Sequence, residues 1–272
     1  MFSKGSEKRR ICNRKELPVH WWFGSSRKFQ DGLAGQDACQ PHVLSQIQFN
    51  GAPPMHWFMD SKLENWSGIT LDSNIRNVIR LNLSGSKLVQ LPESFGDLKL
   101  LTRLDLSNNE LGTLPESISK LNSLRWLNLT YNYLVALPES IGALKSLTFF
   151  DMRQNWFVYL TASIGYLDSL RCLLMPNNRL VQLPDSMGNL KSLTVLDLRD
   201  NHLVTIPVSI GDLNSLIRLE MNRNKLVTLP DSISELNSLK WLMTSENPVS
   251  STKDKRDEII RRFARQGLSM DI

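Results

Sequence analysis

Residues 101–123 read LTRLDLSNNELGTLPESISKLNS, and residues 124–146 repeat the pattern as LRWLNLTYNYLVALPESIGALKS. The same 23-residue spacing runs unbroken from Val78 to Val249 and gives eight copies of Lxx(L/F)x(L/M)xxNx(L/F/V), with small departures. The ninth place is Ser86 in the first copy and asparagine in the other seven: Asn109, Asn132, Asn155, Asn178, Asn201, Asn224 and Asn247. Such a period indicates a repeat array in which each unit buries its apolar side against its neighbours.

Each copy predicts one strand and one turn. The leucines at the first, fourth and sixth places are expected to point inward, and the third to seventh places to form a short strand. Successive strands then pair in parallel and line a concave face. The second half of the unit, such as residues 114–124, places a proline just before a predicted helical turn. The predicted fold is therefore α/β, a horseshoe-shaped solenoid with a parallel concave sheet and short convex helices or 3₁₀ turns.

The recurring asparagine is interpreted as a structural residue. It falls where the chain turns after each strand, and its amide can satisfy backbone groups that would otherwise be buried without partners. No catalytic role is expected for it.

The repeat consensus LPxSIGxLxSLxxLxLxxNxL resembles the intracellular, Ras-group class of leucine-rich repeat proteins. That class includes Ras-suppressor-type and Shoc-type scaffolds, plant intracellular proteins, and bacterial effector or surface proteins. The resemblance covers the repeats, residues 78–249, and implies protein–protein recognition on the concave face. Small GTPases, phosphatases and adaptor segments are among the family's known partner classes, and no motif in this chain selects among them.

The chain is expected to divide into four regions. Residues 1–16 carry six basic and two acidic side chains and predict a flexible basic tail. Residues 17–77 are expected to form an N-terminal extension and cap, residues 78–249 the eight repeats, and residues 250–272 a C-terminal cap helix. The basic tail is the one region where contact with nucleic acid is considered.

The two ends of the array carry different cap patterns. Trp66, followed by Gly-Ile-Thr at residues 68–70, resembles the NW…WxG(I/V)T cap of many plant, protist and bacterial leucine-rich repeat proteins. At the other end, Ser251 or Thr252 is the expected N-cap of an amphipathic helix that stops at Gly267. Its expected buried stripe is Ile259, Ile260 and Phe263, and its expected water-facing side is Arg261, Arg262 and Arg265.

Composition and cysteine content bear on the compartment. No apolar run approaches the ~18 residues that a membrane-spanning helix needs, and the basic N-terminus lacks the apolar region of a secretory signal. The cysteines Cys12, Cys39 and Cys172 are odd in number and widely spaced, which argues against a disulfide framework and a zinc site. The expected location is the cytoplasm, or the host cytosol for a secreted effector, with a mitochondrial location as the alternative.

Enzymatic motifs are absent from the sequence. It contains no GxxxxGK(S/T), GxGxxG, HExxH or GxSxG pattern. Cys172 is the one cysteine expected on the strand face, and no histidine is expected on the strands beside it, so it is interpreted as a small apolar surface residue. We therefore expect no catalytic site, no cofactor and no metal.

The side chains at the third, fifth and seventh places of each repeat are expected to point out of the concave face. The third place is apolar from Trp126 to Val195 with arginines on both sides, and the fourth copy adds an aromatic rim around Trp156. Exposed apolar patches usually mark a partner, and Trp and Arg dominate interface energetics. The candidate partner-binding residues are Arg103, Trp126, Tyr131, Phe149, Arg153, Trp156, Cys172, Leu174, Val195, Arg218 and Trp241.

The charged places have a competing interpretation. Fifth-place carboxylates such as Asp151 are expected to lie near arginines such as Arg153, so many of these charges can simply pair with one another across the strands.

These observations predict a non-catalytic interaction module or scaffold that binds a protein or peptide partner on the concave face. Two alternatives stay open. The chain is either a subunit of a larger assembly, docked by its N-terminal extension, or the substrate-recognition part of a bacterial effector. The oligomeric state is left open.

Overall fold

The computed structural model describes residues 48–49, 68–73, 77–263 and 268–272. All of these residues belong to a single compact unit. The predicted basic tail, and Trp66 of the predicted cap, lie outside the described residues.

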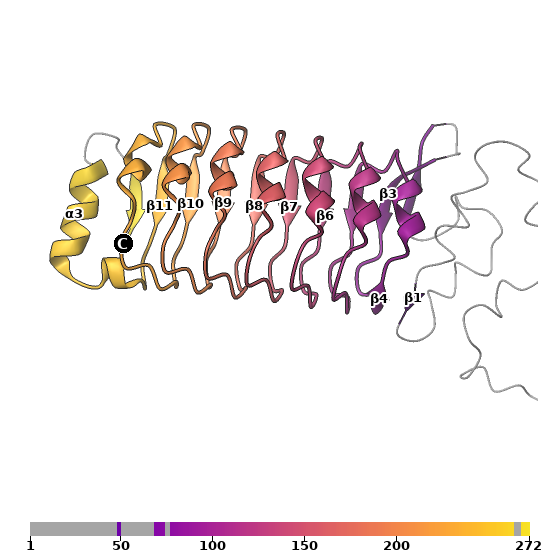
Figure 1. Cartoon of the computed structure of the whole chain (residues 1–272), viewed down its shortest axis with the longest axis horizontal. Helices are drawn as coiled ribbons and strands as arrows, with labels where there is room; N and C mark the ends of the chain where they lie inside the picture. The colour runs from indigo at the N-terminus through magenta and orange to yellow at the C-terminus, as the bar shows by residue number, and fades with distance from the viewer. Residues whose placement is uncertain (1–47, 50–67, 74–76, 264–267) are drawn as a thin grey trace, which may run out of the picture. The chain divides into compact units, whose positions relative to one another are not determined.

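The repeats stack side by side and contribute one short strand each to a ten-stranded sheet (Figure 1). Neighbouring strands from β3 to β12 run parallel, as predicted, whereas β2 runs antiparallel to β3. The strands are β2 (Ile69–Leu71), β3 (Val78–Asn82), β5 (Arg103–Asp105), β6 (Trp126–Asn128), β7 (Phe149–Asp151), β8 (Cys172–Leu174), β9 (Val195–Asp197), β10 (Arg218–Glu220), β11 (Trp241–Met243) and β12 (Ser269–Asp271).

Strand register follows the repeat period. Trp126 faces Phe149, and Phe149 in turn faces Cys172, so each place in a repeat lies beside the same place in the next repeat. Columns of equivalent residues therefore run across the sheet. Outside the main sheet, β1 (Gln48–Phe49) pairs antiparallel with β4 (Leu88–Gln90).

The second half of each repeat forms a 3₁₀ turn on the side away from the sheet (Figure 1). In most repeats the proline lies one residue before the turn, with an extended backbone. The fourth repeat has Thr161 instead, whose hydroxyl accepts a hydrogen bond from the Ser163 amide. The turns are η4 (Glu93–Asp97), η5 (Glu116–Lys120), η6 (Glu139–Ala143), η7 (Ala162–Tyr166), η8 (Asp185–Asn189), η9 (Val208–Asp212), η10 (Asp231–Glu235) and the shorter η11 (Pro248–Ser250).

The turns of neighbouring repeats approach each other closely. A Cβ atom added at Gly165 in η7 would collide with the carbonyl oxygen of Ser186 in η8. A glycine at this place therefore lets the backbones of adjacent turns come into contact.

The asparagine at the ninth place binds backbone groups from two repeats. Asn132 Nδ2 donates to the carbonyl oxygens of Leu106 and Leu129 at 2.9 and 3.0 Å, and its Oδ1 accepts from the Leu111 amide at 3.1 Å. The other repeat asparagines make equivalent bonds, and all are buried. Their predicted structural role is confirmed.

The chain turns sharply before each of these asparagines. The residue ahead of Asn132 is Tyr131, and its φ of 54° lies in the left-handed region that few non-glycine residues adopt. The equivalent residues with positive φ in the later repeats are Gln154, Asn177, Asp200, Arg223 and Glu246.

The C-terminal segment adds a helix and a strand. Helix α3 (Lys253–Phe263) begins after Thr252, whose hydroxyl accepts from the Lys255 amide at 3.4 Å, as expected of an N-cap. The chain then returns to the sheet as β12, in which Met270 pairs with Leu242. This strand was not predicted, because the sequence of residues 250–272 indicated only a cap helix that stops at Gly267.

Two predictions for α3 are wrong. Ile259 is buried, but Ile260 is 43% exposed, because one residue further along a helix points about 100° away. Arg262 was expected to face water, yet it donates to the Leu229 carbonyl oxygen at 3.2 Å and pairs with Asp231. It therefore ties α3 to the last repeats.

No helix among the described residues has the length and apolar character needed to cross a membrane.

Candidate functional site

An aromatic stack lies on the exposed side of the sheet. The rings of Trp126 and Phe149 are nearly parallel, with centroids 5.5 Å apart and 7° between their planes. The Arg103 guanidinium carbon lies 3.8 Å from the centroid of the Trp126 ring. We call the third-place residues Arg103, Trp126, Phe149, Cys172 and Val195 the sheet-face strip. Four of its members are only half-buried and so remain accessible to a partner: Trp126, Phe149, Cys172 and Val195.

The predicted pairing among charged residues is confirmed in part, for Asp151, Asp197 and Glu220. Asp151 is buried, and both of its carboxylate oxygens accept from Arg153, at 2.9 and 2.6 Å. The hydrogen bond to Asp151 is the main cause that raises the pKa of Arg153, so the guanidinium stays charged. Arg153 nevertheless keeps nearly half of its side chain exposed.

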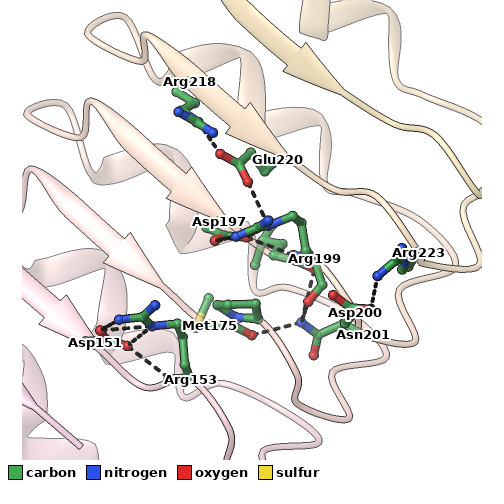
Figure 2. Close-up of polar contacts among 12 residues, drawn as sticks. Asp151, Arg153, Met175, Asp197, Arg199, Asp200, Asn201, Arg218, Glu220 and Arg223 are labelled. Carbon is green, nitrogen blue, oxygen red and sulfur yellow. Dashed lines mark hydrogen bonds and ion pairs between the residues drawn. The ribbon is translucent and has the colours of Figure 1, made fainter. Parts of the chain in front are cut away.

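A longer chain of ion pairs follows in the later repeats (Figure 2). Arg199 lies just after β9 and binds Asp197 at the end of that strand, Nη2 to Oδ2 at 2.8 Å, and its Nε lies 2.7 Å from Glu220 Oε2 on β10. Glu220 also pairs with Arg218. These arginines therefore neutralise buried carboxylates as well as facing solvent.

Leu174 interrupts the column of carboxylates. It pairs in register with Asp151 on one side and faces Asp197 on the other. Leu174 is half-buried and lies two residues from Cys172, so it widens the apolar part of the strip in the middle of the sheet.

Cys172 behaves as an apolar residue. Burial, and then the charges of Asp151 and Asp197, raise the pKa of its thiol to about 11, so it is protonated near neutral pH. A protonated thiol is a poor nucleophile. Within the described ranges, no group of three or more His, Cys, Asp or Glu residues is placed to hold a metal ion.

A second cluster lies on the loops that follow the strands. Trp156 contacts Tyr133, with ring centroids 4.9 Å apart, and the Arg179 guanidinium carbon lies 5.1 Å from the Trp156 centroid. These residues occupy the tenth place of three successive repeats. Tyr131 and Tyr159 are exposed nearby in sequence. Arg179 was not among the predicted residues, although a comparison of the tenth places of successive repeats would have identified it.

The remaining predicted residue, Trp241, is 40% exposed at the third place of β11. The structure therefore places most of the predicted residues in the sheet-face strip, in the neighbouring ion pairs or on the loops around Trp156, whereas Leu174 lies beside the strip and Trp241 lies apart from it on β11.

Protein-family models describe the same repeats. A model of the leucine-rich repeat region matches residues 117–196 and 174–261, and a single leucine-rich repeat model matches residues 100–121. The chain is a leucine-rich repeat protein. No curated protein matches its sequence significantly.

Several solved structures share this fold. The PEPR1–AtPEP1 crystal structure is 30% identical, with a TM-score of 0.69 over 79% of this leucine-rich repeat chain. The HAESA receptor kinase ectodomain from Arabidopsis, solved with an IDA peptide hormone, is 26% identical, with a TM-score of 0.64 over 78%. A plant ice-binding protein is 27% identical, with a TM-score of 0.60 over 71%.

The chain spans less than two thirds of the length of each of these three structures. It spans 32% of the first and 37% of the second, and 64% of the ice-binding protein.

Proposed function

We propose that this leucine-rich repeat protein binds an extended segment of a protein partner on the exposed side of its sheet. The stack of Arg103, Trp126 and Phe149 is the observation that supports this proposal most directly. Stacking orders these side chains before a partner arrives, which lowers the entropic cost of binding. One of the structural relatives, the HAESA receptor kinase ectodomain, was solved with a peptide hormone ligand, which agrees with the proposal.

The rim around Trp156 is proposed as a secondary contact. Its ring already contacts Tyr133 and Arg179, so part of the aromatic surface is used within the chain. We therefore assign the principal role to the sheet-face strip.

We further propose that the protein belongs to the Ras-group class of scaffolds and acts in the cytoplasm. The repeat consensus supports this class. Residues 250–272 are proposed as the C-terminal cap, because Ile259 and Phe263 of α3 are buried and Met270 of β12 packs against the core.

The test compares partner capture by three forms of the full chain. Wild type, the double variant Trp126→Ala/Phe149→Ala, and the control Tyr166→Ala are each used for affinity purification with mass spectrometry. Tyr166 is an exposed aromatic on η7, away from the sheet. Truncating buried interface aromatics costs about 2 kcal/mol each, so the double variant should lose the proteins that wild type and Tyr166→Ala retain.

Thermal melting of all three forms is the folding control. The strip residues are only half-buried, so the melting temperature should change little. Retention of the same partners by a folded double variant would show that the sheet-face strip is not the binding surface.

A further inference from the structure

Two neighbouring arginines lie at the N-terminal end of the sheet-face strip. Arg80 on β3 and Arg103 on β5 face each other in register, and both are exposed. Within the described residues, neither has a carboxylate at ion-pair distance. By contrast, Arg153, Arg199 and Arg218 each bind a buried carboxylate.

The one carboxylate on β5 is held by neutral donors. Asp105 Oδ1 accepts from the Ser107 amide and hydroxyl, at 3.0 and 2.7 Å, and from Asn128 Nδ2 at 3.1 Å. Strands β3 and β5 therefore carry two guanidinium groups and one carboxylate, and that carboxylate is already hydrogen-bonded to neutral groups. Among the described residues, this leaves an excess of positive charge beside the aromatic stack.

Stacking prepares Arg103 to bind an anion. Its guanidinium lies over the Trp126 ring, which leaves the N–H groups at the edge of the plane available. A carboxylate accepts two parallel hydrogen bonds from such an edge. Arg80 lies on the adjacent strand, about 4.8 Å away measured between strand backbones, and adds a second positive charge.

Resting on the function proposed above, we propose that the partner segment is acidic at one end and apolar at the other. An Asp or Glu carboxylate of the partner bridges Arg80 and Arg103. Apolar side chains of the same segment lie against Trp126, Phe149 and the residues beyond them. The segment crosses the strands, so the two contacts are two strand spacings apart, roughly 10 Å, or about three residues of extended chain.

The charge pattern favours a short acidic peptide over a nucleic acid. A polyanion needs positive charge along its whole length, whereas the strip turns apolar at Trp126. The buried carboxylates of Asp151, Asp197 and Glu220 lie further along the sheet.

The experiment is selection of displayed random linear peptides on the immobilised full chain. Three forms are compared: wild type, Arg103→Glu, and the charge-matched control Lys120→Glu, whose exposed side chain lies on η5. Wild type and Lys120→Glu should enrich peptides with an acidic residue about three positions from an aromatic or aliphatic one. Arg103→Glu should lose this preference.

Affinities of the enriched peptides give the quantitative test. Replacing the acidic residue of a peptide by its amide should weaken binding to wild type by about 10- to 100-fold, as expected for a charge-assisted bidentate contact. The same replacement should have little effect on binding to Arg103→Glu. A single-stranded oligonucleotide serves as the competing ligand and should not displace the peptide.

The outcomes separate the two proposals. Peptides that bind without an acidic preference, and are lost with Trp126→Ala/Phe149→Ala, would retain the proposed function but overturn the acidic partner. An acidic preference unchanged in Arg103→Glu, or displacement by the oligonucleotide, would overturn it as well. Absence of any enrichment over the bare support would count against both proposals.

Discussion

Arg199 bridges two neighbouring strands: its Nε lies 2.7 Å from Glu220 Oε2 on β10, and its Nη2 binds Asp197 at the end of β9. Both carboxylates are almost fully buried, and Glu220 is only 3% exposed. Removing the guanidinium leaves two buried negative charges on adjacent strands with fewer partners. The ion pairs of the sheet thus contribute to stability chiefly by compensating carboxylates that the fold has already buried.

We therefore expect Arg199→Met to destabilise the fold by about 1–3 kcal/mol, below the usual cost for a buried pair because Arg199 is half-exposed. Chemical denaturation followed by tryptophan fluorescence measures this loss. Arg171→Met is the control, because Arg171 is exposed and the described part of the chain shows no ion pair to it. Equal losses in the two variants would show that the bridge to Glu220 has no special role.

The positive φ of Gln154 gives a second prediction. A β-branched residue is strained in the left-handed region, whereas asparagine tolerates it. Gln154→Val should lower the free energy of unfolding by about 1–2 kcal/mol, and Gln154→Asn should leave it unchanged or slightly higher. Gln182→Val is the control, at an exposed position whose φ is not positive. A similar loss in the control would point to the valine itself rather than to backbone strain.

Gly165 tests the close contact between turns. Gly165→Ala should destabilise by about 1–3 kcal/mol, the typical cost of overpacking, because the methyl group meets the Ser186 backbone. Gly112→Ala is the matched control, since no atom lies within 4 Å of the Cβ it would add. Serine occupies the place equivalent to Gly165 in η5 and η10, so the variant should fold with a displaced turn. Thermal melting compares the stability of the two variants. A Gly165→Ala variant as stable as Gly112→Ala would contradict the close contact between the turns.

The raised thiol pKa of Cys172 predicts that the stability of the fold decreases at alkaline pH. Its thiol pKa is raised from 9.0 to about 11 in the folded chain, because burial disfavours the thiolate. The raised value means that this group's contribution to stability is fully present below pH 9.0 and is lost as the pH rises to about 11.

Alkylation by iodoacetamide measures this pKa in a variant with Cys12→Ser and Cys39→Ser. The rate for the folded chain should keep rising between pH 9.0 and about 11, whereas the denatured chain should level off near the lower value. A folded chain whose rate levels off near pH 9.0 would contradict the shift.

The regular part of the fold was predictable because one pattern recurs in register. Leucine at the fourth place of most repeats indicated the buried side, and the structure buries Leu104, Leu127 and Leu173 at that place. The asparagine contacts followed from the same repetition, since a buried amide in a turn needs backbone partners.

The exceptions to the period were harder to predict. Strand β12 lacks the leucine pattern and follows a glycine, so only its pairing with β11 reveals it. Arg153 and Arg199 each pair with a carboxylate two residues earlier in the chain, yet the sequence alone could not decide between paired and free arginines. What separates Arg103 from them is the neutral hydrogen bonding of Asp105, and that depends on side-chain geometry rather than residue type.

The amide contacts of Asn132 also bear on how the chain folds. They reach residues 21, 26 and 3 positions earlier in the sequence, and the same separations recur in later repeats. The distance along the chain that a contact must close therefore does not grow as repeats are added. Folding can begin at one pair of repeats and spread to its neighbours, so lengthening the array should change the folding rate far less than it would in a domain whose ends must meet.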